Sequence, residues 1–169
     1  MKHSLITLAL VFCWIAGFAQ QAERNISVIP EPVSLLKKGG HYVLPDEVVV
    51  SIPSGKETAY VAGLLKEKLS LAPGKNVTVR ENSRNAHIAL SLNSKEDATL
   101  GNEGYKLDVT TQKITISANK PAGLLYGVQT LFQLLPPQIE SDRREENVSW
   151  QVPLVEITDY PRVGWRGLM

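Results

Sequence analysis

The sequence has almost no cysteine and no excess of charge of either sign. Its single cysteine, Cys13, lies within the first twenty residues, so the rest of the chain has no thiol to act as a nucleophile, bind zinc or form a disulfide bond. Lysine and arginine total 18 and aspartate and glutamate total 17, which leaves a formal net charge of +1. Binding to nucleic acid requires a basic surface that displaces counterions from phosphates. The charge balance therefore argues against nucleic acid as a partner.

The first nineteen residues have the pattern of an export signal. Lys2 supplies a positive charge, residues 5–18 carry none, and Gly17 and Ala19 place small side chains where a signal peptidase reads them. The uncharged stretch of about fourteen residues is shorter than the roughly 20 that a membrane-spanning helix needs. We therefore predict a signal peptide at residues 1–19, no membrane span, and export of the mature protein to the periplasm or the extracellular space.

Beyond the signal, the hydrophobic pattern predicts an α+β domain over residues 20–153. Apolar residues at helical spacing predict one helix over 58–71 and a second that begins at Lys120 with Asn119 as its N-cap. Runs of β-branched or alternating apolar residues predict strands at 33–36, 41–44, 47–52, 77–80, 87–91, 104–109, 113–117 and 150–157. The first two of these strands flank Gly39-Gly40, which predicts a turn between them.

The second predicted helix is apolar over more than one stripe. Leu124, Val128 and Leu131 share one face, whereas Leu125 and Phe132 lie elsewhere on the helical wheel. We therefore expect the helix to be covered on two sides, by its own sheet and by a further structure. Without that second cover, Leu125 and Phe132 are expected to lie in water and to make the isolated chain self-associate.

Motifs that carry chemistry are scarce. The sequence has no glycine-rich phosphate loop, no G-x-S-x-G and no H-E-x-x-H. Adjacent carboxylates occur at Asp46-Glu47, Glu96-Asp97 and Glu145-Glu146, and pairs of carboxylates are what glycosidic cleavage usually requires. Neighbours on a strand point to opposite faces, and each pair lies at a loop or strand edge, so we interpret all three as solvated surface charge. His41 and His87 have no second ligand at metal spacing, and we predict no metal site.

Three blocks of the sequence nevertheless resemble a known family. They are Val28-Ile-Pro-Glu-Pro-Val33; the run from Glu103-Gly-Tyr-Lys-Leu-Asp-Val109 to Pro121-Ala-Gly-Leu-Leu-Tyr-Gly-Val-Gln-Thr-Leu-Phe-Gln-Leu-Leu-Pro136; and Asp159-Tyr-Pro-Arg-Val-Gly-Trp-Arg-Gly-Leu-Met169. In this order and spacing they resemble the N-terminal domain of family 20 glycoside hydrolases, the β-N-acetylhexosaminidases, followed by the start of the catalytic (β/α)8 barrel.

The resemblance implies a definite domain organisation. Residues 20–153 would form a sheet with two helices packed on one face, and residues 154–169 would be the truncated start of the barrel. The barrel would pack on the helix at 121–135 and supply its second cover. Arg162, Trp165 and Arg166 match the start of the barrel and are interpreted as structural. The catalytic pair and the sugar-binding arginine of the family would lie beyond Met169, so no catalytic or substrate-binding residue is predicted in this chain.

The resemblance also implies an activity for the full-length protein. In that family terminal N-acetylhexosamine is hydrolysed with retention, because the acetamido oxygen of the substrate itself attacks the anomeric carbon, and no cofactor is needed. This chain alone is predicted to be inactive. The alternative is a non-catalytic carbohydrate-binding or interaction module, although only Trp150 and Trp165 remain as tryptophan platforms after the signal. The apolar end at Met169 predicts a truncated sequence, and a cut before Thr158 is expected to improve solubility.

Overall fold

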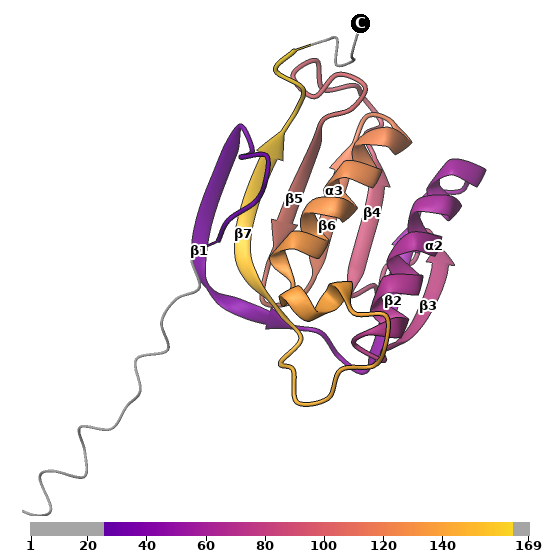
Figure 1. The fold of residues 1–169 in the computed structure, drawn as a ribbon. Coiled ribbons are helices and arrows are strands. Elements are labelled where there is room, and N and C mark those ends of the chain that lie inside the picture. Colours follow the sequence, from indigo (N-terminus) through magenta and orange to yellow (C-terminus); the bar gives the residue numbers. More distant parts are fainter. Residues whose placement is uncertain (1–25, 164–169) are drawn as a thin grey trace, which may run out of the picture.

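The computed structural model describes residues 26–163, which form a seven-stranded mixed sheet and two α-helices (Figure 1). The strands are β1 (Ser34–Val43), β2 (Glu47–Ile52), β3 (Asn76–Glu81), β4 (Ile88–Leu92), β5 (Tyr105–Val109), β6 (Ile114–Ala118) and β7 (Gln151–Asp159). The helices are α2 (Lys56–Leu71) and α3 (Pro121–Leu134), and α3 is followed by a short 3-10 helix, η1 (Pro137–Glu140). The predicted signal peptide lies outside the described residues.

The strand order in the sheet is β1-β7-β5-β6-β4-β2-β3. The pairs β1–β7, β7–β5 and β5–β6 are antiparallel, whereas β6–β4, β4–β2 and β2–β3 are parallel. The strands predicted at 104–109 and 113–117 therefore form an antiparallel hairpin, β5–β6. Because the first and last strands are neighbours, the segment before β1 lies next to the segment that follows β7.

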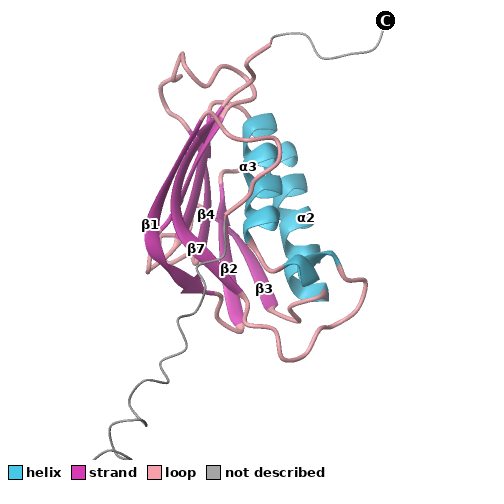
Figure 2. Ribbon diagram, turned by 60° about the vertical axis from the view of Figure 1, so that its left-hand side comes forward, coloured by secondary structure: helices cyan, strands magenta, loops and turns pink. Residues whose placement is uncertain are grey.

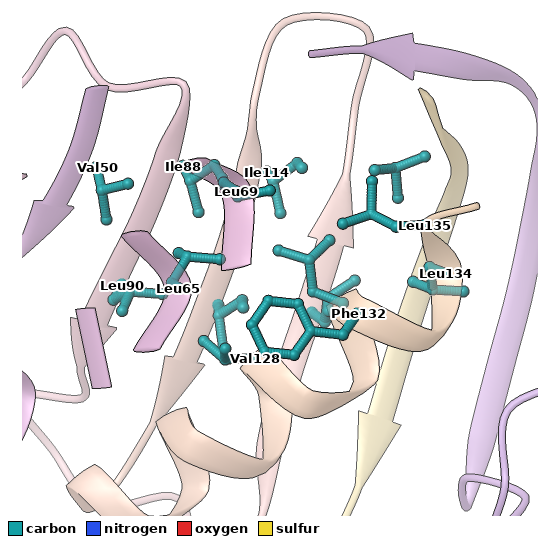
Figure 3. Close-up of a cluster of buried hydrophobic side chains, with 14 of the residues drawn as sticks. Val50, Leu65, Leu69, Ile88, Leu90, Ile114, Val128, Phe132, Leu134 and Leu135 are labelled. Carbon is teal, nitrogen blue, oxygen red and sulfur yellow. The ribbon is translucent and has the colours of Figure 1, made fainter. Parts of the chain in front are cut away.

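Both helices cover the same face of the sheet, as Figure 2 shows, so the predicted α+β architecture with two helices on one face is confirmed. The core lies between the two layers, where alternate strand residues meet the inner faces of the helices (Figure 3). Val50, Ile88 and Ile114 of the sheet and Leu65 and Leu69 of α2 are fully buried there. None of the described helices has the length and apolar character needed to cross a membrane.

The apolar surface of α3 is covered more fully within the domain than the sequence predicts. Phe132 is only 5% exposed, because α2 lies beside α3 and η1 packs against α2. Leu125 is half-buried in the groove between the first turns of the two helices. The expectation that Phe132 needs a cover from outside the domain is therefore wrong, and on the described part of α3 the large exposed apolar side chain is Tyr126.

Two glycines set the distance between α3 and the sheet. A β-carbon on Gly123 would lie 2.3 Å from the backbone oxygen of Gly104, and one on Gly127 would lie 2.4 Å from Cγ2 of Ile116. Side chains at these positions would push the helix away from β5 and β6. This close approach is the physical reason for the Ala-Gly-Leu-Leu-Tyr-Gly-Val block singled out in the sequence.

The first strand differs from the prediction of two short strands joined by a turn. β1 is one strand that runs through Gly39 and Gly40, and these adopt φ values of 70° and 85°. Lys37 pairs with Val155 and His41 with Pro153, so β1 has two residues more than β7 over this interval. The glycines therefore form a bulge in a continuous strand, since glycine adopts positive φ without steric cost.

The last strand crosses the predicted domain boundary between residues 153 and 154. β7 extends to Asp159, and its residues 155–159 pair with β1, β5 or both. Residues 154–159 thus belong to the sheet instead of opening a barrel. Of the segment predicted to start the barrel, residues 164–169 lie outside the described residues.

Candidate functional site

The three carboxylate pairs lie at the surface, as the sequence predicts. Asp46 Oδ1 accepts a hydrogen bond from Lys75 Nζ at 2.8 Å, and this bond lowers the pKa of Asp46. Glu96 pairs with Lys120 Nζ at 2.5 Å, which lowers its pKa in the same way. A catalytic acid needs the opposite shift, which burial among apolar groups provides. These carboxylates therefore stabilise surface loops and are not suited to protonate a glycosidic oxygen.

The two histidines take part in the strands. His41 is exposed on β1, and Nδ1 of His87 accepts the backbone N–H of Val49 at 3.0 Å. Among residues 26–163, no group of three or more histidine, cysteine, aspartate or glutamate side chains could hold a metal ion. Every buried side-chain nitrogen or oxygen in this part of the chain also has a hydrogen-bond partner. The interior therefore presents no polar group that awaits a ligand.

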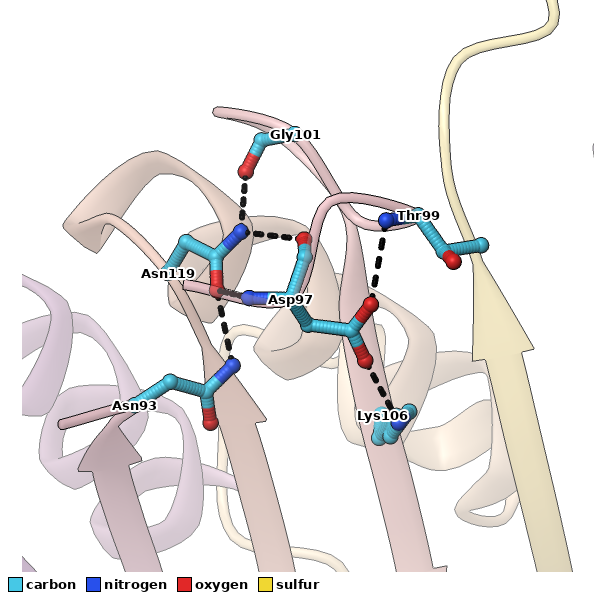
Figure 4. Close-up of polar contacts among 6 residues, drawn as sticks. All are labelled: Asn93, Asp97, Thr99, Gly101, Lys106 and Asn119. Carbon is cyan, nitrogen blue, oxygen red and sulfur yellow. Dashed lines mark hydrogen bonds and ion pairs between the residues drawn. The ribbon is translucent and has the colours of Figure 1, made fainter. Parts of the chain in front are cut away.

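Asn119 has a different role from the predicted N-cap of α3. Its Oδ1 accepts hydrogen bonds from Asn93 Nδ2 at 2.8 Å and from the backbone N–H of Asp97 at 2.9 Å (Figure 4). Its Nδ2 donates to the backbone oxygens of Asp97 and Gly101, each at 2.8 Å. Lys120 is the N-cap residue, without a capping side-chain bond. Asn119 therefore fastens the 93–103 loop to the point where β6 ends and α3 begins.

The same loop is held from its other side by a charged pair. Asp97 Oδ2 lies 2.8 Å from Lys106 Nζ, and its Oδ1 accepts the Thr99 N–H at 3.0 Å. These bonds, that to Lys106 foremost, lower the pKa of Asp97. The polar cluster is thus an internal brace of the loop, and its acceptors and donors are used within the fold.

A cleft lies where the chain leaves the sheet, and we call it the exit cleft. It has a volume of about 420 Å³ and lies between α3, the segment before β1 and the segment after β7. Its lining combines apolar and charged side chains: Val28, Ile29, Pro30, Glu31, Glu103, Tyr105, Tyr126, Gln129, Thr130, Gln133, Asp159, Tyr160, Pro161 and Arg162. Clefts of this size and mixed lining are common binding sites in proteins.

Side-chain bonds to backbone hold the walls of the exit cleft together. Gln133 on α3 accepts the Ile29 N–H through Oε1 at 2.8 Å and donates through Nε2 to the Ile29 carbonyl at 3.1 Å. Asp159 Oδ1 accepts the Val33 N–H at 3.2 Å. The segment before β1 is therefore tied both to α3 and to the end of β7.

The floor of the exit cleft contains a buried hydroxyl pair. Tyr105 Oη and Thr130 Oγ1 lie 2.6 Å apart. Burial raises the pKa of Tyr105 to about 12, an effect to which the nearby Asp159 adds and which the bond to Thr130 partly offsets. The phenol therefore stays protonated at physiological pH and acts as a neutral link between β5 and α3.

Of the three residues predicted to mark the start of the barrel, the structure describes only Arg162. It is exposed, lines the exit cleft, and donates from Nη2 to the backbone oxygen of Glu31 at 3.5 Å. Trp165 and Arg166 lie outside the described residues. Sequence reasoning missed the exit cleft, because its walls come from segments about a hundred residues apart and no local pattern joins them. The available signal was the polar Gln129, Thr130 and Gln133 on a mostly apolar helix.

Comparison with known proteins assigns the chain to a family. The sequence model described as glycosyl hydrolase family 20, domain 2, matches residues 25–160. A beta-hexosaminidase of Porphyromonas gingivalis is 30% identical over 147 residues, which cover 87% of this chain and 19% of that protein. A beta-N-acetylhexosaminidase of Cellulomonas fimi is 31% identical over 145 residues, which cover 85% of this chain and 28% of that protein.

Solved structures show the same relationship. The N-acetyl-beta-hexosaminidase of Streptomyces plicatus, in complex with thio-NAglucal, has a TM-score of 0.75 and 36% identity over 82% of this chain and 27% of its own. The beta-N-acetylhexosaminidase of Bacteroides fragilis has a TM-score of 0.62 and 29% identity over 83% of this chain and 26% of its own. The chain thus spans less than a third of the length of each of these four relatives. Since the family match covers most of the chain and the fold agrees with it, the chain belongs to glycosyl hydrolase family 20, of which it contains domain 2.

Proposed function

We propose that this chain is the non-catalytic domain that precedes the catalytic barrel of a β-N-acetylhexosaminidase. The full-length protein hydrolyses terminal N-acetylhexosamine residues of glycans, with retention and with the substrate's acetamido group as the nucleophile. The observation that carries the proposal is the match of residues 25–160 to domain 2 of family 20, together with relatives named as hexosaminidases. The signal pattern at residues 1–19 supports export to the periplasm or the extracellular space.

The outer surface of the helix layer is the surface that we assign to the barrel. A groove of about 530 Å³ lies between the first turns of α2 and α3, lined in part by Tyr60 and Leu125. A second groove, of about 370 Å³, lies further along the same two helices and includes Leu71. Tyr60 is 64% exposed near the start of α2 and Leu71 is 43% exposed at its end, and large apolar side chains in water along a groove favour a contact surface.

The opposite face of the sheet is less suited to such a contact. Lys38 Nζ lies 2.7 Å from Asp108 Oδ1 and 3.1 Å from Glu156 Oε2, so a charged cluster spans the β1, β7 and β5 side of that face. Burying these charges against a second domain would cost desolvation energy that the ion pairs do not fully return. The barrel is therefore assigned to the helices and not to the open face of the sheet.

The alternative of a free-standing carbohydrate-binding module is less well supported. A binding module stacks sugars on exposed aromatic rings, and tryptophan is the residue with the largest such face. Trp150, the tryptophan within residues 26–163, is only 6% exposed and is part of the core. It is therefore unavailable as a platform for a sugar.

An activity assay tests the proposal. The purified 169-residue chain should release no aryl alcohol from an aryl N-acetyl-β-glucosaminide above the buffer rate, whereas the protein isolated from its source should hydrolyse it. The variants Asp46→Asn and Glu47→Gln of the isolated chain test whether any turnover that it shows depends on these two adjacent carboxylates. Turnover by the isolated chain that is lost in either variant would show that this domain is catalytic. An inactive protein from the source would show that the proposed activity is wrong.

A further inference from the structure

The parallel half of the sheet has a short ladder at its middle, between β2 and β4. Every residue of β2 pairs with β3, and every residue of β4 pairs with β6. Between β2 and β4, however, the paired residues are Val50 with Ile88 and Ser51 with Ala89. Because β3 is an edge strand, the unit of β2, α2 and β3 is attached to the other strands of the sheet by this short ladder.

His87 extends the ladder at the end where β4 begins. Its backbone N–H donates to the Val49 oxygen at 2.9 Å, and its Nδ1 accepts the Val49 N–H at 3.0 Å. Because β4 starts one residue later, at Ile88, the imidazole supplies the acceptor that a strand carbonyl would otherwise provide. His87 and Val49 are both half-buried, so water competes only partly for these groups.

The bond from Val49 requires the neutral form of the ring. A neutral imidazole has one N–H and one acceptor nitrogen, so acceptance by Nδ1 places the proton of His87 on Nε2. An imidazolium donates from both nitrogens, and its Nδ1–H would then face the Val49 N–H, donor against donor. Protonation therefore breaks the bond. Histidine is the side chain whose charge ordinarily changes between about pH 5 and 8.

The charged groups around the ring are of both signs. On β2, Glu47 lies two residues before Val49 and therefore on the same face of the sheet. Lys113 lies beside His87 across the start of the β4–β6 ladder, and Arg84 precedes His87 by three residues. On the other face, α3 has no aspartate, glutamate, lysine or arginine. These charges act on an imidazolium in opposite directions, and the bond to Val49 is the contact that distinguishes the two states of the ring.

From this geometry we propose that His87 is a pH-sensitive clasp between β2 and β4. The neutral ring fastens Val49 to the start of β4, and the imidazolium releases it. The stability that the bond contributes is present while the ring is neutral and is lost as the pH falls through the range in which histidine gains a proton. Mild acid thus loosens the unit of β2, α2 and β3, which carries part of the helix surface assigned to the barrel. The clasp belongs to the fold and holds whether or not the full-length protein has the proposed hydrolase activity.

The position of the proton on the ring tests the geometry. Nitrogen-15 NMR of the 169-residue chain at about pH 7.5, where histidine is mostly neutral, should show the His87 proton on Nε2. His41, which is exposed on β1, provides the comparison, and the variants His87→Asn and His41→Asn assign the two rings. A neutral His87 ring with its proton on Nδ1 would overturn the proposal.

Hydrogen exchange tests the release. The protection factor of the Val49 amide, which corrects for the intrinsic effect of pH on exchange, should be about tenfold lower at about pH 5 than at about pH 7.5. Carboxylates stay largely ionised over this range, so their ion pairs are retained. The amide of Leu107 in β5 is the control within the same chain, and its protection factor should not change.

Two variants separate His87 from other effects of acid. Asparagine offers Oδ1 as an acceptor that does not titrate, so His87→Asn should have the same Val49 protection factor at both pH values. His41→Asn is the matched control and should lose protection at Val49 as the wild type does. Thermal melts at both pH values establish that each variant is folded. A fall in protection that is absent in the wild type, equal in His87→Asn, or equal at Leu107 would overturn the proposal.

Discussion

Gly127 of α3 lies so close to Ile116 of β6 that no side chain fits between them. A β-carbon at position 127 would be 2.4 Å from Ile116 Cγ2, a distance that real β-carbons do not adopt. One helical turn earlier, Gly123 meets the backbone of Gly104 in the same way. The glycines thus seat α3 on β5 and β6, and through α3 they position Gln129 and Gln133 at the exit cleft.

We expect Gly127→Ala to lower the free energy of unfolding by about 1–3 kcal/mol, because overpacking shifts the helix or its neighbours. This loss exceeds the roughly 0.8–1.0 kcal/mol that alanine gains over glycine in a helix interior. Gly63→Ala is the control, since a β-carbon on Gly63 of α2 would meet nothing within 4 Å, and this variant should be more stable than the wild type. Urea titrations measure both. Equal effects of the same sign would contradict the close approach of α3 to Ile116.

The second prediction concerns the brace of the 93–103 loop. Asn119 is 8% exposed and makes four hydrogen bonds, so Asn119→Ala should leave buried partners unpaired and cost about 1–3 kcal/mol. Hydrogen exchange of the Asp97 amide should accelerate. The exposed Asn102 of the same loop provides the control Asn102→Ala. An unchanged exchange rate at Asp97 would show that Asn119 does not hold the loop.

The third prediction is a dependence of stability on acid. Lys106 and the Thr99 N–H hold the pKa of Asp97 below its ordinary value of 3.8. A carboxylate whose pKa is depressed by folding contributes stability above its unfolded-state pKa, and this contribution is lost as the pH falls through the folded-state pKa. The pKa values of Asp46 and Glu96 are lowered as well, so their ion pairs act in the same direction.

The urea midpoint should therefore fall as the pH drops below about 4, and the fall should be smaller in Asp97→Asn. Added salt should also make the fall of the urea midpoint with pH smaller, because salt screens exposed ion pairs. Midpoints measured at several pH values, with and without salt, check this. A profile that is identical in Asp97→Asn would show that the pair with Lys106 contributes nothing.

The fourth prediction concerns where the domain can be cut. A chain that ends at Val163 retains all of β7, whereas a cut before Thr158 removes the pairs of Thr158 with Ser34 and of Asp159 with Tyr105. It also removes the carboxylate that accepts the Val33 N–H. We therefore expect the shorter chain to melt at a lower temperature and to be less soluble than the chain that ends at Val163, whereas the sequence alone led us to expect a gain in solubility. Melting curves and the soluble yields of the two chains check this prediction.

Local sequence patterns were enough to specify most of the secondary structure and to identify the family. The β-branched run at 47–52 becomes β2, the apolar stripe at 58–71 becomes α2, and the alternating segments at 104–117 become the β5–β6 hairpin. These patterns repeat over two to four residues, so neighbours in the chain suffice to specify them. The acidic pairs were also correctly placed at the surface, because nothing near them in the sequence could bury them.

Only the tertiary structure shows which distant segments of the chain are in contact. Its packing pairs β1 with β7 across the bulge at Gly39 and Gly40, and it buries Phe132 under elements of its own domain. It makes Asn119 the brace of a loop instead of the expected cap, and it joins Ile29 to Gln133, 104 residues away. Contacts between residues so distant depend on how the layers pack, and the periodicity of a single segment carries no information about its partner.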